Sequence, residues 1–451
     1  MTNDEITKVL SDSIQFTSNI DKELFAKMGV KRGLRNEDHS GVLAGLTRIG
    51  DVVGYQRSED GSLKAIPGKL FYRGIDVEEL VNGIQQDNRL GFEETIFLLL
   101  SGRLPNREEL EASKRLIAQR MPLNHAATMS IISRKGKNIM NILARSVLEL
   151  YIYDSNPDDI SPANLISQSF NLISKFPTII AYAYQVLRHD QMGRSLHIRF
   201  PKEDCSITEN FLFLMKGPGN YTELDVKILD LALILHAEHG GGNNSTFSVR
   251  VTSSTETDTY SAIAAGIGSL KGPLHGGANI KVNGMIKDIK ENVKDWTDSD
   301  EVDEYLRKIL RKEAYDKTGL IYGLGHAVYT VSDPRTGLLK NMAKDLAKEK
   351  GLDKEFAFME LIEDRAKAMF KESKKKTAKS DVCINVDFYS GFVYEAIGLP
   401  EEVFTPLFAM ARIVGWSAHR IEELNFGSKR LIRPAYKNVR ERQEFIPIDK
   451  R

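Results

Sequence analysis

Residues 270–279 have the sequence LKGPLHGGAN, in which His275 stands among glycines and apolar residues. An imidazole gains little from packing against glycines, which instead let a ligand approach the backbone closely. A helical pattern begins near Ala278, so the ring is expected near a helix N-terminus, where the dipole favours a neutral imidazole. Such a ring can donate a hydrogen bond to a developing oxyanion. The segment therefore predicts a helical fold that carries an active-site histidine.

A second glycine-rich segment, residues 323–335, has the sequence GLGHAVYTVSDPR and places His326 in similar surroundings. An imidazole has a reference pKa near ~6.5, so it can act neutral or protonated at working pH. Asp333 and Pro334 are typical of a turn, and this turn would present Arg335, whose rigid fork of donors suits a carboxylate. We expect these groups to share a site with His275.

Most of the remaining chain repeats apolar residues at helical spacing, as from Phe92 to Leu99, which predicts a mainly α fold. The exception lies near the N-terminus. Residues 42–55 and 63–72 are rich in β-branched and aromatic residues on either side of a polar turn at residues 58–61. This pattern predicts one small β-hairpin.

Composition changes near residue 284, and the chain is then densely charged to about residue 380. We interpret residues 284–390 as a small helical domain inserted into a large one, which consists of residues 1–283 and 391–451. Residues 1–41 are an N-terminal extension of the first part. The alternative, that the charges only mark solvated helix faces, is equally compatible with the charge pattern.

The 451 residues include 62 acidic and 62 basic side chains, so broad attraction to nucleic acid or an anionic membrane is not expected. The two cysteines, Cys205 and Cys383, lack metal-ligand spacing, which fits a reducing compartment. The first residues resemble neither a signal peptide nor an Arg-rich transit peptide, and no apolar run approaches the ~18 residues of a membrane helix. We therefore expect a cytoplasmic protein.

His236 and His239 lie three residues apart near the end of an apolar helix that the glycines at 240–242 would stop. Both side chains could face a cavity, although His236 is equally well explained as a helix-end histidine favoured by the dipole. A zinc site is disfavoured because the chain has no HExxH motif and no supporting cysteine.

Asp387 is enclosed by apolar and aromatic neighbours, and burial would raise its pKa and make it a better base. The alternative is an N-cap for a helix from about Phe388 to Ile397.

Arg412 lies within an apolar helix from Phe404 to Trp416, where a charge is expensive to bury without an anionic partner. Arg433 follows a short loop after that helix. With Arg335, these arginines indicate a small polycarboxylate ligand.

Four segments, taken together and in order, resemble the citrate synthase family. They are HAEHGGGNNSTF (236–247), LKGPLHGGAN (270–279), GLGHAVYTVSDPR (323–335) and NVDFYSG (385–391). Weaker similarity occurs in KLFYRGIDVEEL (69–80) and FEETIFLLLSGRLP (92–105), and the resemblance extends from about residue 42 to about residue 436. It implies that family's two-domain helical fold. It also implies condensation of acetyl-CoA with oxaloacetate and hydrolysis of citryl-CoA to citrate and CoA, as in the tricarboxylic acid cycle, without metal or redox cofactor.

The resemblance also implies roles for individual residues. Asp387 matches the base that removes a methyl proton from acetyl-CoA, His275 the donor that stabilises the enol, and His326 the group that polarises the ketone of oxaloacetate. The positions that match carboxylate binders are His239, Arg335, Arg412 and Arg433. In the family the arginine at the position of Arg433 reaches into the partner subunit's site, which implies a homodimer with shared active sites.

Some positions depart from the family pattern. Many relatives have Asp-His-Glu where this chain has Glu238-His239-Gly240, so hydrogen bonding around the histidine is expected to differ. Thr330 stands where some relatives carry a basic residue near the CoA phosphates, and Lys379 is a candidate replacement, although its lysine-rich segment is also typical of a solvated one. Residues 1–41 are not explained by the resemblance, and either a dimer arm or a regulatory segment fits them.

Two alternatives to a citrate synthase remain. A 2-methylcitrate synthase would use propionyl-CoA, and one methylene is worth only ~1–3 kcal/mol in a pocket, so the motifs do not separate the two. A non-catalytic sensor of acyl-CoA or carboxylates is disfavoured because Asp387, His275 and His326 are all present.

Overall fold

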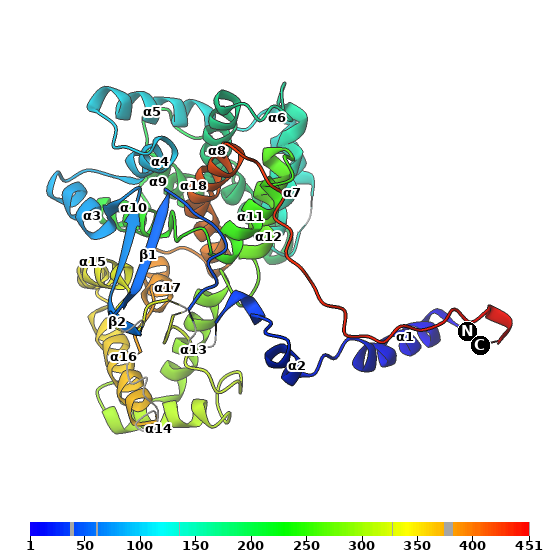
Figure 1. The fold of residues 1–451 in the computed structure, drawn as a ribbon. Coiled ribbons are helices and arrows are strands. Elements are labelled where there is room, and N and C mark those ends of the chain that lie inside the picture. The colour runs from blue at the N-terminus through cyan, green and yellow to red at the C-terminus, as the bar shows by residue number, and fades with distance from the viewer. Residues whose placement is uncertain (37–39, 60–61, 135, 327, 374–381, 451) are drawn as a thin grey trace. The chain divides into compact units, whose positions relative to one another are not determined.

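The computed structural model describes residues 1–36, 40–59, 62–134, 136–326, 328–373 and 382–450 (Figure 1). These residues form two compact units, Met1–Leu46 and Thr47–Arg451. The first contains α1 (Asn3–Thr17), α2 (Lys22–Lys27) and the short 3-10 helix η1 (Arg32–Leu34). Thr2 and Glu5 form a capping box at the start of α1, which fixes that helix end locally.

The second unit is mainly helical, as predicted, and contains one small sheet. Its strands are β1 (Gly50–Arg57), β2 (Leu63–Tyr72) and β3 (Ile75–Asp76). Its first helices are α3 (Val77–Gln86), α4 (Phe92–Ser101), α5 (Arg107–Arg120), α6 (His125–Ser133), α7 (Ile139–Leu150), α8 (Pro162–Met192), α9 (Ile207–Lys216) and α10 (Glu223–His236). The later ones are α11 (Asn244–Ser253), α12 (Thr259–Leu270), α13 (Ala278–Asn292), α14 (Ser299–Leu310), α15 (Pro334–Lys350), α16 (Asp353–Ser373), α17 (Asp387–Ala396) and α18 (Phe404–Leu424). Short 3-10 helices lie at η2 (Tyr151–Tyr153), η3 (Glu401–Val403) and η4 (Ile448–Lys450).

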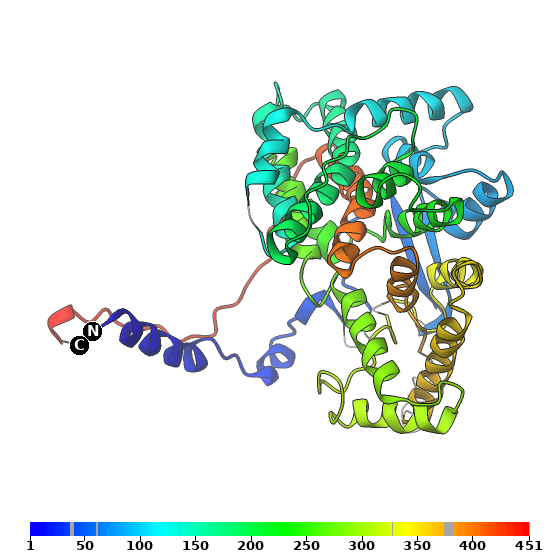
Figure 2. The same cartoon turned by 180° about the vertical axis from the view of Figure 1, so that it is seen from behind.

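Helix α18 is the most enclosed element of this unit. Its residues from Phe404 to Arg420 are almost all buried, because α8, α10, α11 and α12 pack around it (Figure 2). A helix that is apolar on all sides is expected in the centre of a large core. The predicted helix from Phe404 to Trp416 is therefore confirmed, and it continues to Leu424.

The predicted hairpin is present, but its first strand begins later than expected. β1 and β2 pair antiparallel from Gly50 with Tyr72 to Arg57 with Leu63, and β3 adds a short third strand. The expected start of the first strand at Val42 is wrong: residues 42–49 lie outside the sheet, and the partner strand ends at Tyr72 opposite Gly50. The turn residues 60 and 61 lie outside the described residues.

Glycines bring the hairpin against the loop that contains His326. Gly68 N donates to the carbonyl oxygen of Ser332 (3.1 Å), and a side chain on Gly54 would collide with the backbone of Val328. Tyr329 Oη donates to the carbonyl oxygen of Lys69 (3.3 Å). The sheet thus supports one wall of the candidate site.

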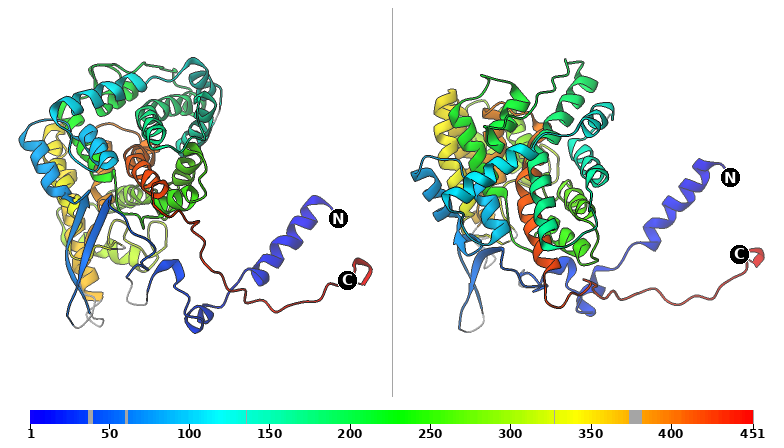
Figure 3. Two further views of the ribbon diagram at one scale, coloured as in Figure 1. Left: turned by 45° about the horizontal axis from the view of Figure 1, so that its top comes forward. Right: turned by 90° about the horizontal axis from the view of Figure 1, so that it is seen from above.

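Helices α13, α14, α16 and α17 form a neighbourhood in the second half of the chain, where α14 packs on α16 and α13 on α17 (Figures 1 and 2). The expected domain boundaries at residues 284 and 390 stay a prediction. After α18 the chain continues as an extended, mostly exposed tail to residue 450 (Figure 3). Within the described residues, every helix is too short or too polar to cross a membrane.

Candidate active site

The C-terminal end of α10 provides the first two candidate histidines. His236 is the last residue of α10, and His239 lies beyond it, so the two do not share one helix face as predicted. Tyr72 fixes this end: its hydroxyl oxygen lies 2.9 Å from the carbonyl oxygen of Ile234 and 3.1 Å from that of Glu238. Gly240 takes a positive φ of 81°, which turns the chain towards α11.

A short antiparallel contact joins the segment of His326 to the segment of Asp387. Gly325 N donates to the carbonyl oxygen of Cys383 (2.8 Å), and Asn385 N donates to that of Gly323 (2.9 Å). The φ angles of Gly323 and Gly325 are 80° and 93°, a conformation that favours glycine. This explains why glycines precede His326, and it places two predicted site residues on adjoining strands of backbone.

His326, His239 and Tyr329 form a cluster of rings. The centroid of the His326 ring lies 5.2 Å from that of His239 and 4.7 Å from that of Tyr329. The backbone N–H groups of Val328 and Tyr329 both donate to His326 Nδ1, each at 3.1 Å. Because Nδ1 accepts these bonds, a neutral His326 carries its proton on Nε2 and can donate it towards a ligand.

His275 lies just before α13, which begins at Ala278 as predicted. Ser245 N donates to His275 Nε2 (3.4 Å), and Ser245 Oγ lies 3.0 Å from the same atom. The proton of the neutral ring is then on Nδ1. Burial lowers the pKa of His275 to about 4, and the charge of Arg412 acts in the same direction. The ring is therefore a neutral donor at physiological pH.

Asp387 is the first residue of α17, and the residue at the N-cap position is Val386. Its carboxylate makes no capping bond, so the alternative interpretation of Asp387 as an N-cap is wrong. Its backbone N–H instead donates to Asn385 Oδ1 (3.1 Å). Burial raises the pKa of Asp387 to about 6, although Arg335 and Arg412 oppose the rise. This carboxylate is a stronger base than a solvated aspartate.

The two arginines of the cluster are buried. Arg335 donates through Nε and Nη2 to the two oxygens of Asp333, at 3.0 and 2.7 Å. Arg412 Nε donates to the carbonyl oxygen of His236 (2.7 Å), but Nη1 and Nη2 are buried and have no hydrogen-bond partner among the described residues. Burial lowers the pKa of Arg412 to about 10. A buried cation with two unsatisfied donor groups favours an anionic ligand.

Phe408 connects the two halves of the cluster and was missed by sequence analysis. Its ring centroid lies 4.6 Å from that of His236 and 6.4 Å from that of His275, and Arg412 Cζ lies 4.7 Å from it. The sequence does contain a pattern that indicates Phe408, because Phe408 and Arg412 are four residues apart on one helix and share a face. Ser245 was likewise missed, although it lies in the same glycine-rich segment as His239.

Glu238 begins a buried polar network behind His239. His419 Nε2 donates to Glu238 Oε1 (2.9 Å), and His419 Nδ1 accepts from Arg250 Nε (3.0 Å). Arg250 also forms ion pairs with Glu422 and Glu423. Glu238 additionally accepts from the backbone N–H of Gly240, so its side chain shapes the turn that presents His239.

Two predicted site residues are not part of the cluster. The side chain of Arg433 is exposed, and the residue lies in the tail beyond α18. Lys379 lies outside the described residues. Thr330 Oγ1 is buried without a hydrogen-bond partner in the described part of the chain.

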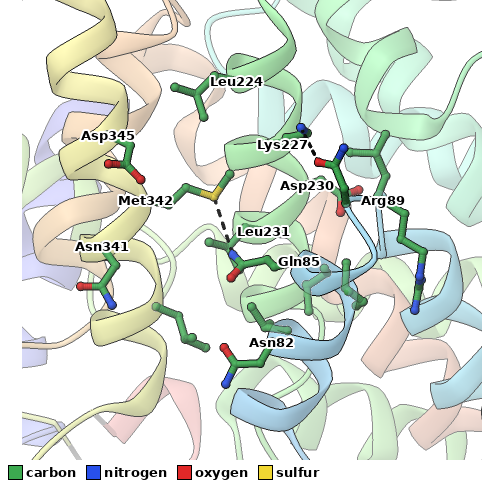
Figure 4. A pocket seen from close by; sticks show the side chains of 16 residues that line it. Asn82, Gln85, Arg89, Leu224, Lys227, Asp230, Leu231, Asn341, Met342 and Asp345 are labelled. Carbon is green, nitrogen blue, oxygen red and sulfur yellow. Dashed lines mark hydrogen bonds between the residues drawn. The ribbon is translucent and has the colours of Figure 1, made fainter.

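A cavity of about 340 Å³ lies away from this cluster, between α3, α10 and α15 (Figure 4). Asn82 and Gln85 face Asn341, Met342 and Asp345 across it, and the predicted site residues do not line it. Because its walls combine acidic, basic and amide groups, they define no single class of ligand.

Comparison with known proteins shows the family. Residues 38–435 match the family model of the citrate synthase C-terminal domain. The chain belongs to the citrate synthase family. It is 36% identical over 389 residues to citrate synthase 2 of Bacillus subtilis, covering 86% of this chain and 94% of that protein. It is 33% identical over 399 residues to a 2-methylcitrate synthase of Shewanella oneidensis, covering 85% and 92%.

A solved citrate synthase from Thermoplasma acidophilum, in a ternary complex with carboxymethyl coenzyme A and oxaloacetate, has the same fold. The TM-score is 0.74 at 26% identity, with 93% of this chain and 99% of that chain covered. This citrate synthase homologue is therefore an acyltransferase of the citrate synthase type, and its family uses oxaloacetate and an acyl-CoA as substrates.

Proposed function

We propose that the chain is a citrate synthase, which joins the methyl carbon of acetyl-CoA to the ketone carbon of oxaloacetate and hydrolyses the resulting thioester. The observation that carries the proposal is the buried Arg412, whose Nη1 and Nη2 lack partners among the described residues, beside the unpartnered Nε2 of His239. Oxaloacetate is a dianion with a ketone between its carboxylates. Cationic and neutral donors held in a buried site suit both features.

Oxaloacetate would bind between α15 and α18. Arg412 and Arg335 would each donate to a carboxylate, and His239 would add a hydrogen bond. His326 Nε2–H would donate to the ketone oxygen, because its Nδ1 is occupied by two backbone N–H groups. This bond draws charge from the ketone carbon and makes it more electrophilic.

Asp387 would then remove a proton from the methyl group of acetyl-CoA while His275 Nδ1–H donates to the thioester oxygen. Neither group suffices alone, because the thioester α-proton is weakly acidic; the hydrogen bond stabilises the enol as it forms. The new carbon–carbon bond forms at the ketone carbon, and the ketone oxygen takes up a proton from His326. Water subsequently cleaves the thioester to citrate and CoA. No step in this scheme calls for a metal or redox cofactor.

The assembly that we propose is a homodimer in which Arg433 completes the site of the partner subunit. The exposed position of Arg433 beyond α18 is compatible with this role. Lys379 remains the candidate for the CoA phosphates. We also propose a cytoplasmic location.

The second candidate is 2-methylcitrate synthesis from propionyl-CoA, because a relative at 33% identity has that name. The same base and donors would serve both reactions, and an extra methylene changes binding by only ~1–3 kcal/mol.

The deciding experiment measures free-thiol release by the purified protein with oxaloacetate plus either acetyl-CoA or propionyl-CoA. We expect a higher kcat/KM with acetyl-CoA. A higher value with propionyl-CoA would establish the second candidate. If neither acyl-CoA gave oxaloacetate-dependent thiol release, the proposal would fail and the non-catalytic sensor would become the favoured alternative.

A further inference from the structure

Strand β1 runs past the turn that presents His239, and it leaves room there for the side chain of Glu238. A Cβ added at Gly50 would lie 2.8 Å from both Cγ and Oε1 of Glu238, and the three nearest atoms all belong to that side chain. Val52, also in β1, lies beside Gly240, where an added Cβ would be 3.1 Å from Val52 Cγ2. The backbone of β1 is therefore closely fitted to residues 238–240.

A second glycine, in α18, also lies against the side chain of Glu238. A Cβ at Gly415 would collide with Glu238 Oε2 and with the carbonyl oxygen of Ala237, and Gly415 N donates to that carbonyl oxygen (3.1 Å). Glu238 is fully buried, and its Oε2 has no hydrogen-bond partner among the described residues. The carboxylate therefore fits a space that exists because two glycines from different elements lack side chains.

The side chain of Glu238 acts on the backbone that carries His239. Its Oε1 accepts from Gly240 N and from His419 Nε2, the second at 2.9 Å. His239 Nε2 is buried and has no hydrogen-bond partner in the described part of the chain. Because Glu238 and Gly240 flank His239, a displacement of the Glu238 carboxylate changes the turn and moves the imidazole with it.

We propose that Glu238 and Gly50 are matched positioning residues, which together set where His239 presents Nε2 to oxaloacetate. The inference rests on the proposed function, in which His239 forms a hydrogen bond with the substrate. Glu238 and Gly50 act through His239 and do not touch the substrate themselves. The long side chain at position 238 requires the absence of a side chain at position 50. An aspartate at position 238, one methylene shorter, would leave the space beside Gly50 empty.

Calorimetry with oxaloacetate on the full-length protein tests the pair through a double-mutant cycle. Glu238→Asp should weaken oxaloacetate binding about fivefold, the contribution of one hydrogen bond, because the shortened carboxylate no longer supports the turn. Gly50→Ala should weaken binding by a similar factor, because the added methyl group displaces the Glu238 side chain. In the Glu238→Asp background that methyl group enters vacated space, so Gly50→Ala should change the affinity by less than about twofold.

Thiol release with acetyl-CoA separates positioning from a general loss of structure. We expect the KM for oxaloacetate to rise in each single variant, while kcat at saturating substrates stays within about threefold. The matched controls are Glu93→Asp, which shortens a buried carboxylate on α4 that accepts from Ile207 N (2.7 Å), and Gly268→Ala on α12, where an added Cβ meets nothing within 4 Å beyond its own stretch of helix. Both should keep the affinity for oxaloacetate.

Normal oxaloacetate binding by Gly50→Ala or by Glu238→Asp would overturn the inference and leave the proposed function standing. Additive effects in the double variant would overturn it as well, because a matched pair cannot behave as two independent residues. Gly50→Ala keeps every polar group of the network, so it decides alone if Glu238→Asp fails to fold. An unchanged protein that binds no oxaloacetate would instead overturn the proposed function, and this inference with it.

Discussion

Asp387 occupies a helix start without serving as its cap, and this leaves its carboxylate for chemistry. Asp387→Asn removes the proton acceptor while retaining size and shape. We expect kcat to fall by about a hundred- to ten-thousandfold, the usual contribution of a general base, with little change in oxaloacetate affinity. Steady-state kinetics with calorimetry measure both quantities. Asp364→Asn, an exposed aspartate on α16, is the control, and near-normal turnover by Asp387→Asn would exclude its role as base.

The same substitution should stabilise the fold at neutral pH. The folded pKa of Asp387 is about 6 against an ordinary 3.8, so ionisation disfavours the folded state, and stability falls as pH rises between these values. Asn removes that penalty, which corresponds to about 1–3 kcal/mol for this partly buried group. Urea unfolding at about pH 7.5 should show the gain, and at about pH 3 the gain should nearly vanish because both states then largely bind the proton. An equal gain at both pH values would contradict a raised pKa.

Arg412 makes a separate prediction about substrate binding. Arg412→Leu removes the two donor groups that lack partners among the described residues, so oxaloacetate should bind at least about tenfold more weakly. Arg412→Lys keeps the positive charge but lacks the planar pair of donor groups, so its affinity for oxaloacetate should lie between those of the unchanged protein and Arg412→Leu. Calorimetry with oxaloacetate measures the affinities, and an unchanged value for Arg412→Leu would remove Arg412 from the binding site.

At the scale of elements, the segment that follows α10 is joined to α11 and α18 by the buried bonds of Glu238, His419 and Arg250. His419 accepts from Arg250 at Nδ1 and donates to Glu238 from Nε2. His419→Ala leaves both charged partners without their shared group and should lower the free energy of unfolding by about 2–4 kcal/mol. His419→Gln retains one donor and one acceptor and should lose much less. Urea unfolding compares the variants, and equal losses would show that the donor–acceptor pattern is not what stabilises the network.

Sequence patterns predicted which segments form helices better than they predicted the residues at which helices and strands begin and end. The start of α13 at Ala278 follows from the glycines before it, and the buried α18 follows from its apolar run. The start of β1 was wrong because β propensity reports suitability for a pleated surface, whereas the end of β2 at Tyr72 fixes where pairing stops. His239 lies beyond α10 because three backbone carbonyls near the helix end surround Tyr72 Oη, a long-range contact that local spacing does not encode.

At the scale of the molecule, the proposed shared site predicts that two inactive variants can restore each other. Asp387→Asn damages a subunit's own site, whereas Arg433→Leu would damage only the partner's. A hybrid dimer would therefore contain one site with both substitutions and one intact site. Mixing the variants under conditions that exchange subunits should recover activity, measured as thiol release. No recovery after exchange has been verified by mass spectrometry would contradict a shared site.

The sequence only partly predicted how segments that are distant along the chain come together in the candidate active site. The motifs indicated that His275, His326 and Asp387 share a site, and the family resemblance assigned their roles. The tautomers of His275 and His326 were not predictable, because they depend on the backbone N–H groups of Ser245, Val328 and Tyr329. Phe408 was overlooked because an aromatic residue in a buried helix is normally part of the core.

The backbone contact between residues 323–325 and 383–385 has a consequence for how new substrates could evolve. Backbone hydrogen bonds join the segment of His326 to that of Asp387, whereas Phe408 reaches the cluster from α18. A substitution at Phe408 can reshape the space beside His275 without changing the spacing of the other two groups. A single substitution on α18 can therefore change which acyl chain length the site accepts, while the spacing of His326 and Asp387 stays the same.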